Sequence, residues 1–224
     1  MTTDIFVIYH DNLNIIDDIK NDIKYFKCNN NFINKYTDSG INIIEQLPEY
    51  QFLQPSFAEF TAFKMLLDKN LIEGDWVCTL QYDHDLNKSI IDDIKLSDVI
   101  MIFNPFGIGV NAVYNQNYSI GNENCMDWIL NNYNLFFNKE YTFDNISEIP
   151  LPMCSAVKIK KETFNKIMNW ILSYSKDLFS NLSSNIAWHP RWIGMMQERM
   201  FAVAVSFEIF EGQTYKNYPL EHHA

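Results

Sequence analysis

Apolar positions along this chain follow two spacings, and each spacing predicts one kind of element. Short runs of consecutive apolar, β-favouring residues predict buried strands, whereas apolar residues three and four positions apart predict helices. The strand-like runs cover residues 4–11, 74–81, 98–105 and 151–160. The helical spacing covers residues 12–26, 55–70, 88–96, 126–137, 161–179 and 191–210. Strands that alternate with helices in this way predict an α/β fold with a mainly parallel central sheet flanked by helices.

Polar segments separate these elements and predict loops. They cover residues 29–40, the Gly-, Asn- and Tyr-rich stretch 107–124, and residues 181–190, and the tail 211–224 is expected to be irregular. The chain has no repeat, low-complexity segment or clear linker in its 224 residues. One domain is therefore expected, because this length fits a single large domain.

Composition narrows the expected compartment and partners. A membrane helix needs about eighteen consecutive apolar residues, and the chain has no such run and no signal-like N-terminus. The cysteines are widely spaced and form no CxxC pair, which favours reduced thiols and a cytoplasmic location. The oligomeric state is not indicated by the sequence.

The net charge of -11 excludes duplex nucleic acid as an expected partner, because phosphate binding needs clustered Lys and Arg. An anionic ligand would need a cation at its own site. Arginine is scarce, with only Arg191 and Arg199 in the chain, so their positions are of interest.

An acidic feature follows the strand-like run 74–81. Asp83 and Asp85 flank His84, directly after Tyr82. If the strand continued to its tip, the two carboxylates would point to the same side, because side chains alternate along a strand. Paired carboxylates suit hard divalent cations such as Mg²⁺ or Mn²⁺. A solvated acidic turn is the alternative, and DxD alone does not decide between them.

Three further segments resemble a family of small GT-A-type glycosyltransferases, which includes bacterial capsular and exopolysaccharide enzymes and capsid-modifying enzymes of large DNA viruses. The strand ending in IYHD is the first. The second is an aromatic-x-Glu-x-Thr helix closing on Lys-Asn, matched by Phe57, Glu59, Thr61, Lys69 and Asn70. The third is a late Arg…Glu-Arg helix, matched by Arg191, Glu198, Arg199 and Phe201. The resemblance covers roughly residues 5–210.

The chain departs from the bacterial members at one place. Many of those carry Tyr-Arg-Arg after the central strand, where this chain has Tyr82-Asp83-His84-Asp85. That difference favours the metal-dependent viral branch, and with it a virus-encoded enzyme acting in the host cytoplasm.

The resemblance implies a single GT-A-like (Rossmann-like) domain over residues 1–224 that transfers sugar from a nucleotide-sugar donor, UDP-linked by expectation, to a glycan or glycoprotein acceptor such as a viral capsid glycan. Residues 1–105 would be the nucleotide-sugar-binding half and residues 106–224 the acceptor side. A non-catalytic nucleotide-sugar-binding or scaffold domain of the same fold is the alternative, and a Mg²⁺ phosphohydrolase is a third possibility.

The resemblance also implies a donor site. Its expected residues are Tyr9, His10, Asp11, Glu59, Thr61, Lys64, Asp83, His84 and Arg191. Tyr9, His10 and Asp11 would hold the nucleobase, or they are an ordinary strand end. Lys64 would reach the uridine or phosphate, or it lies on a solvated helix face. His84 would face the ribose or diphosphate, or it is a half-exposed turn histidine.

A Mn²⁺ or Mg²⁺ ion is expected on Asp83, Asp85 and His222, with Asp85 the more direct ligand. An ordinary tail or the remains of an affinity tag is the competing interpretation of His222 and His223. Glu198 is the expected catalytic base if the reaction inverts, with Asp127 as the alternative. A structural ion pair between Glu198 and Arg199 or Arg191 is the competing interpretation.

Overall fold

The computed structural model describes most of the chain. The described residues are 1–9, 17–28, 41–45, 47, 50, 59–103, 105, 107–108, 117, 119–120, 123–152, 155–181 and 192–220, with the side chains of 107–108, 119–120 and 176–181 excepted. Statements below about what is absent apply to these residues.

A seven-stranded sheet forms the centre of the described chain, in the order β11-β5-β10-β4-β1-β2-β3. Its strands are β1 (Thr3–Tyr9), β2 (Lys24–Lys27), β3 (Asn42–Glu45), β4 (Trp76–Gln81), β5 (Ile100–Phe103), β10 (Val157–Lys160) and β11 (Tyr215–Tyr218). All neighbouring pairs are parallel except those of β10, which runs antiparallel to β4 and β5. The α/β class and the mainly parallel sheet expected from the sequence are therefore confirmed.

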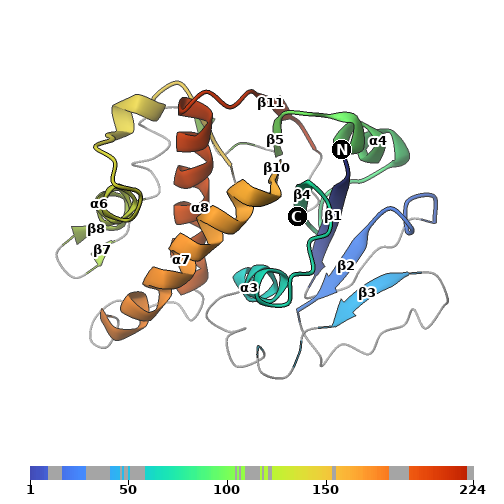
Figure 1. Cartoon of the computed structure of the whole chain (residues 1–224), viewed down its shortest axis with the longest axis horizontal. Coiled ribbons are helices and arrows are strands. Elements are labelled where there is room, and N and C mark those ends of the chain that lie inside the picture. The colour runs from blue at the N-terminus through green and yellow to red at the C-terminus, as the bar shows by residue number, and fades with distance from the viewer. Residues whose placement is uncertain are drawn as a thin grey trace.

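Helices cover both faces of the sheet, and Figure 1 shows α7 and α8 crossing beside the strands. The helices are α3 (Phe60–Asp68), α4 (Lys88–Leu96), α6 (Cys125–Phe137), α7 (Lys161–Asn181) and α8 (Trp192–Phe210). The larger core cluster joins one sheet face to α3, α6, α7 and α8. The smaller cluster joins the opposite face to α4 and to Ile19 and Ile23. Because both faces are buried, the strands are apolar on both sides, as in other parallel sheets.

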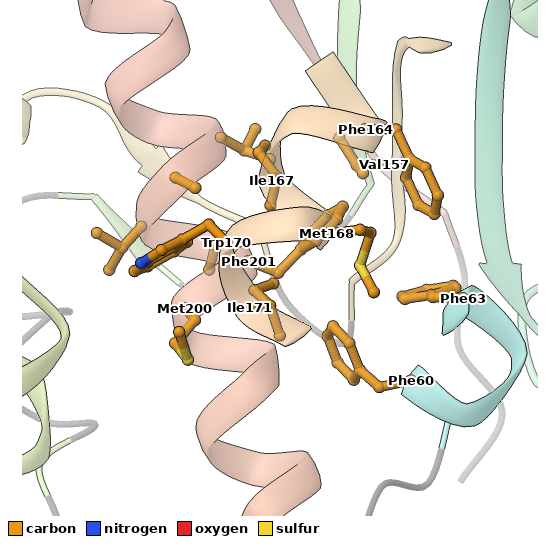
Figure 2. Packing of buried hydrophobic residues seen from close by; sticks show 14 of the residues in the cluster. Phe60, Phe63, Val157, Phe164, Ile167, Met168, Trp170, Ile171, Met200 and Phe201 are labelled. Carbon is orange, nitrogen blue, oxygen red and sulfur yellow. The ribbon is translucent and has the colours of Figure 1, made fainter. Parts of the chain in front are cut away.

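Aromatic rings from three helices meet in the larger cluster (Figure 2). Phe63 of α3 lies 5.6 Å from Phe164 of α7 and 5.9 Å from Phe201 of α8, measured between ring centroids. Phe60 packs edge-on against Phe63 at 5.0 Å. Edge-to-face aromatic pairs add to the stabilisation that burial alone provides. This cluster fixes α3 against α7 and α8, and it buries Phe60 and Phe63 in the core.

The segment 12–26 was expected to be one helix, and that expectation is wrong where the chain is described. Residues Lys24–Lys27 form strand β2, which pairs with β1 and β3. Ile23 is buried on one face of the sheet and Phe26 on the other. Their spacing imitates a helical stripe, but the two side chains belong to opposite clusters.

The tail was expected to be irregular, and this is also wrong in part. Tyr215–Tyr218 forms β11, which pairs with β5 at the edge of the sheet. The predicted loop 107–124 contains the short strands β6 (Gly107–Ile108), β7 (Ser119–Ile120) and β8 (Glu123–Asn124). β6 pairs with β9 (Pro150–Leu151). A 3-10 helix, η1 (Phe143–Ile146), precedes β9 along the chain.

None of the helices in the described part of the chain is long and apolar enough to cross a membrane.

Candidate active site at the carboxyl edge of the sheet

Six of the seven strands, all except the antiparallel β10, end along one edge of the sheet, here called the carboxyl edge. β1, β2, β3 and β4 are parallel, so their last residues, Tyr9, Lys27, Glu45 and Gln81, lie along the same side. Tyr9 is in register with Lys27, and Lys27 with Glu45. Residues 82–85, here called the acidic turn, directly follow β4. Because β4 is the neighbour of β1, this turn is one strand away from Tyr9. Ligands of open α/β sheets bind beyond this edge, which makes it the candidate site.

The acidic turn differs from the extended tip expected from the sequence. β4 ends at Gln81, and Tyr82 and Asp83 form a turn instead of continuing the strand. The backbone N–H of His84 donates to the carbonyl of Gln81 at 3.3 Å, which closes the turn. The alternation argument for placing Asp83 and Asp85 on one side is therefore wrong, because it requires extended backbone.

His84 holds this turn in place. Its side chain is only 2% exposed, and its Nδ1 lies 3.2 Å from the backbone nitrogen of Gln81, which donates to it. Nδ1 also lies 3.7 Å from Oδ1 of Asp83, whose side chain is 18% exposed. The alternative of a half-exposed turn histidine is wrong. Contact between His84 and the ribose or diphosphate of the nucleotide sugar stays a prediction, and the buried ring offers little surface for such a contact.

Two of the three expected cation ligands, Asp83 and Asp85, lie among the described residues, and the cation itself stays a prediction. Within the described residues, no group of three or more His, Cys, Asp or Glu side chains comes close enough to hold a metal ion. Asp83 and Asp85 supply carboxylate oxygens, which are the ligands that Mg²⁺ and Mn²⁺ prefer. His222 lies outside the described residues. Leu220, two residues before it, is buried in the same cluster as Leu86, which directly follows the acidic turn.

The helix after the turn is anchored at its beginning. Asn87 caps α4 by accepting a hydrogen bond from the backbone of Ile90 at 3.1 Å. Lys88 and Lys95 of this helix both donate to Asp22, the former at 2.8 Å. Hydrogen bonds from these two ammonium groups lower the pKa of Asp22. The acidic turn is thus followed at once by a helix that is tied to the segment before β2.

A buried lysine anchors the other end of α4. Lys158 of β10 donates from Nζ to the carbonyl of Ile94 at 2.6 Å and to the carbonyl of Ser97. It also lies over the ring of Trp76, 4.8 Å from the centroid. Burial lowers the pKa of Lys158 to about 8. A cation at a helix C-terminus satisfies carbonyls that have no partner inside the helix.

Tyr9 and Lys27 are both buried at the carboxyl edge. The Tyr9 hydroxyl has no hydrogen-bond partner among the described residues, and the residue is 3% exposed. Burial, together with Glu45 and the Cys28 thiol, raises the pKa of Tyr9 to about 12, so the hydroxyl stays protonated. Lys27 is 5% exposed, and its Nζ lies 4.0 Å from Oε1 of Glu45.

Lys27 is not among the site residues predicted from the sequence, because the helix predicted over residues 12–26 places Lys27 just after a helix instead of in a strand. The signal that could have found it is the KYFK sequence of β2, in which aromatic, β-favouring residues lie between two lysines. As a strand, this segment places Lys27 beside Tyr9, whereas in a helix Lys27 would have had no relation to the candidate site.

The donor residues expected on α3 have varied surroundings. Glu59 occupies the N-cap position of α3. Burial raises the pKa of the Cys28 thiol, and the negative charge of Glu59 raises it further. Because Cys28 directly follows the end of β2, Glu59 lies near the carboxyl edge. Thr61 is fully buried, and its hydroxyl has no hydrogen-bond partner among the described residues. Lys64 forms an ion pair with Asp68 at 2.5 Å, which supports the helix-face interpretation.

The two candidate bases lie on different helices. α8 ends near the amino end of β11, so its first turns, which carry half-buried Glu198, point toward the carboxyl-edge side. Arg199 donates from Nη1 to the carbonyl of Met195 at 2.6 Å. Asp127 is exposed on α6, and in Figure 1 α8 lies between α6 and strands β1 to β4. Their catalytic roles remain predictions.

Four of the expected site residues fall outside the part of the chain that the structure describes. His10, Asp11 and Arg191 lie outside the described residues, as does His222.

A depression of about 610 Å³ lies at the opposite, amino edge of the sheet. Its lining includes Glu73, Asp75, Trp76, Lys160 and Lys161. Residues of this region bond to one another: Asp75 accepts from the N-terminal segment at 3.0 Å, and Lys161 donates to the carbonyl of Ile72. The depression is therefore distant from the acidic turn, at the other end of β4.

Comparisons with known proteins support the fold. No protein-family model matches the chain, and no curated protein is similar to it in sequence. Among solved structures, the chain is similar to the apo structure of WbbM, a bifunctional glycosyltransferase, with a TM-score of 0.66 and 15% identity. The similarity covers 99% of this chain and 45% of WbbM, so the chain spans less than half the length of that protein. The chain is a single α/β domain, and its mostly parallel sheet flanked by helices is consistent with a GT-A-like, Rossmann-like fold.

Proposed function

We propose that the protein is a metal-dependent glycosyltransferase that moves a sugar from a nucleoside-diphosphate sugar, UDP-linked by preference, to a glycan or glycoprotein acceptor. The observation that carries this proposal is the position of Asp83 and Asp85, immediately beyond the end of a central parallel strand in a GT-A-like fold. The carboxyl ends of strands are where such sheets bind nucleotides.

The acidic turn would hold a Mn²⁺ or Mg²⁺ ion through Asp83 and Asp85, with the donor diphosphate completing the coordination. Such an ion neutralises the negative charge that develops on a departing diphosphate. The protein needs this charge compensation, because its net charge of -11 repels an anionic donor.

The roles of His84, Glu198 and Asp127 in this proposal follow from where these residues lie in the fold. The buried ring of His84 keeps the acidic turn in one conformation, and the anchored helix α4 limits its movement. Glu198 would accept the proton of the attacking acceptor hydroxyl if the reaction inverts the anomeric centre, with Asp127 as the alternative.

The test is the binding of UDP by calorimetry with Mn²⁺ and with EDTA, in the natural protein and in Asp85→Ala. We expect Asp85→Ala to remove the Mn²⁺-dependent part of binding while thermal unfolding stays cooperative. Asp92→Ala is the matched control, since Asp92 is a half-exposed carboxylate on the following helix that pairs with Lys88. Unchanged UDP affinity in Asp85→Ala would reject the proposal.

Turnover separates an enzyme from a binding domain. A slow, Mn²⁺-stimulated release of UDP from UDP-sugars supports the glycosyltransferase. Binding without turnover on any donor and acceptor pair would support a non-catalytic nucleotide-sugar-binding domain, and release of inorganic phosphate would support a phosphohydrolase.

A further inference from the structure

Three neighbouring strands present one polar residue each at the same level of the carboxyl edge. Tyr9, Lys27 and Glu45 are the last residues of β1, β2 and β3, and they are in direct register. Side chains in direct register on parallel strands share a face of the sheet. Tyr9 belongs to the smaller core cluster, so this row lies on the same face as α4.

The ammonium group of Lys27 has little to bind within the described protein. Lysine is almost never buried without a partner, yet Lys27 is 5% exposed. Its ion partner there is Glu45, at 4.0 Å between Nζ and Oε1. That distance is too long for a hydrogen bond, so the protons of the ammonium group remain available to a ligand.

Glu45 and Tyr9 complete the row with different chemistry. The side chain of Glu45 is 66% exposed and, as a carboxylate, only accepts hydrogen bonds. The hydroxyl of Tyr9 is buried without a hydrogen-bond partner among the described residues, which costs free energy that a bound ligand would offset. An ammonium group, a carboxylate and a phenol hydroxyl therefore lie together, and the residues that carry two of them, Lys27 and Tyr9, are almost fully buried.

The row lies at a suitable distance from the acidic turn. Neighbouring strands are about 4.8 Å apart, so β2 lies about 10 Å from β4 across β1. This is comparable with the length of a nucleoside, which separates the base of a nucleotide from its diphosphate. A diphosphate held at Asp83 and Asp85 would leave the base near Tyr9 and Lys27.

We propose that Lys27 and Glu45, with Tyr9, read the base of the donor and select bases that present a carbonyl beside a ring N–H. Lys27 would donate to the carbonyl and Glu45 would accept from the adjacent N–H. Uracil, thymine and guanine have this edge, whereas cytosine and adenine present an amino group beside an unprotonated nitrogen. The inference deepens the proposed function and rests on it.

The test compares UDP with CDP, which differ only in this edge, by calorimetry in the presence of Mn²⁺. We expect the natural protein to bind UDP at least about tenfold more tightly than CDP, as loss of one charged hydrogen bond implies. Lys27→Met keeps the buried stem and removes the ammonium group. It should weaken UDP binding about tenfold and reduce the ratio of the two affinities to within about threefold.

Two further variants keep the test sharp. Lys24→Met changes the other lysine of β2, which pairs with Asp4 at 2.9 Å at the opposite end of the strand, and it should leave the UDP/CDP ratio unchanged. Glu45→Gln changes an exposed side chain, so it should fold normally. Because an amide can donate as well as accept, this variant should also reduce the ratio, and it carries the test if Lys27→Met does not fold.

The outcomes separate the two proposals. Binding of UDP and CDP with equal affinity, or an unchanged ratio in both Lys27→Met and Glu45→Gln, would overturn base reading and leave the glycosyltransferase proposal intact. Failure of the natural protein to bind any nucleoside diphosphate with Mn²⁺ would overturn both.

Discussion

The two ends of the central strands use their polar residues differently. At the amino edge, Asp4 accepts from the backbone N–H groups of Glu73 and Gly74, at 2.6 and 2.8 Å, and pairs with Lys24 at 2.9 Å. At the carboxyl edge, the buried hydroxyl of Tyr9 lacks a hydrogen-bond partner among the described residues, and Lys27 has an acid only at 4.0 Å.

The difference indicates which end is built for stability and which for binding. Fully paired polar groups stabilise the fold and have nothing left to offer a ligand. Buried groups that are left under-satisfied cost stability, and such costs occur mostly at functional sites. The depression at the amino edge is therefore a weaker candidate site than the strand ends at the carboxyl edge.

The largest expected effect is on stability at the amino edge. Asp4→Ala should lower the free energy of unfolding by about 3 kcal/mol, because it leaves two backbone N–H groups without their acceptor and removes the nearer of the two acids that pair with Lys24. Urea denaturation measures this. UDP affinity, measured well below the melting temperature, should not change. A loss of UDP binding in the folded variant would contradict the division between the two edges.

The next largest effect is expected at the carboxyl edge, where a substitution should weaken UDP binding and leave stability unchanged or higher. Tyr9→Phe removes a hydroxyl without a hydrogen-bond partner among the described residues, so the free energy of unfolding should stay unchanged or rise by up to about 1 kcal/mol. UDP affinity should fall several-fold. Tyr25→Phe is the control, since Tyr25 is buried on the same sheet face within β2. A marked destabilisation in Tyr9→Phe would show that the hydroxyl is structural.

A smaller effect is expected from acid. Burial favours a higher pKa for Asp4, but the N–H of Gly74, the ammonium of Lys24 and the N–H of Glu73 outweigh it and lower the pKa below 3.8. A carboxyl whose pKa is lowered by folding contributes stability above its unfolded pKa and loses it as the pH falls through the folded pKa. The difference in unfolding free energy between the natural protein and Asp4→Asn should therefore shrink below about pH 4. A difference that stays constant from pH 6 to pH 3 would contradict this.

The smallest effect is expected in the amino-edge depression. Lys160 is exposed and lines it, so Lys160→Ala should change the free energy of unfolding by less than about 0.5 kcal/mol. UDP affinity should stay the same, measured by calorimetry. Weaker UDP binding in this variant would move the donor site to the amino edge.

Local patterns predicted the elements whose periodicity has a single interpretation. The strands β1, β4 and β5 are apolar runs with polar ends, and α4 has a capping residue at its start. β2 was missed because the spacing of Ile23 and Phe26 imitates a helical stripe, and β11 was missed because its strand character depends on a partner far away in the sequence. β11 has the polar sequence YKNY, and pairing with β5 makes it a strand.

The candidate site shows the same limit. Asp83 and Asp85 were found because acidic residues after an apolar strand form a local signal. Their turn was mispredicted because the burial of His84, which closes it, depends on tertiary packing.

The amino-acid sequence by itself determined the α/β class, the alternation of strands and helices, and the acidic residues after β4, since each depends on neighbours within a few positions. Only the tertiary structure decided that Lys27 stands beside Tyr9 and Glu45 at the edge to which that acidic turn belongs. The physical reason is that register between parallel strands is set by hydrogen bonds and packing across the sheet, between residues that the chain itself keeps apart.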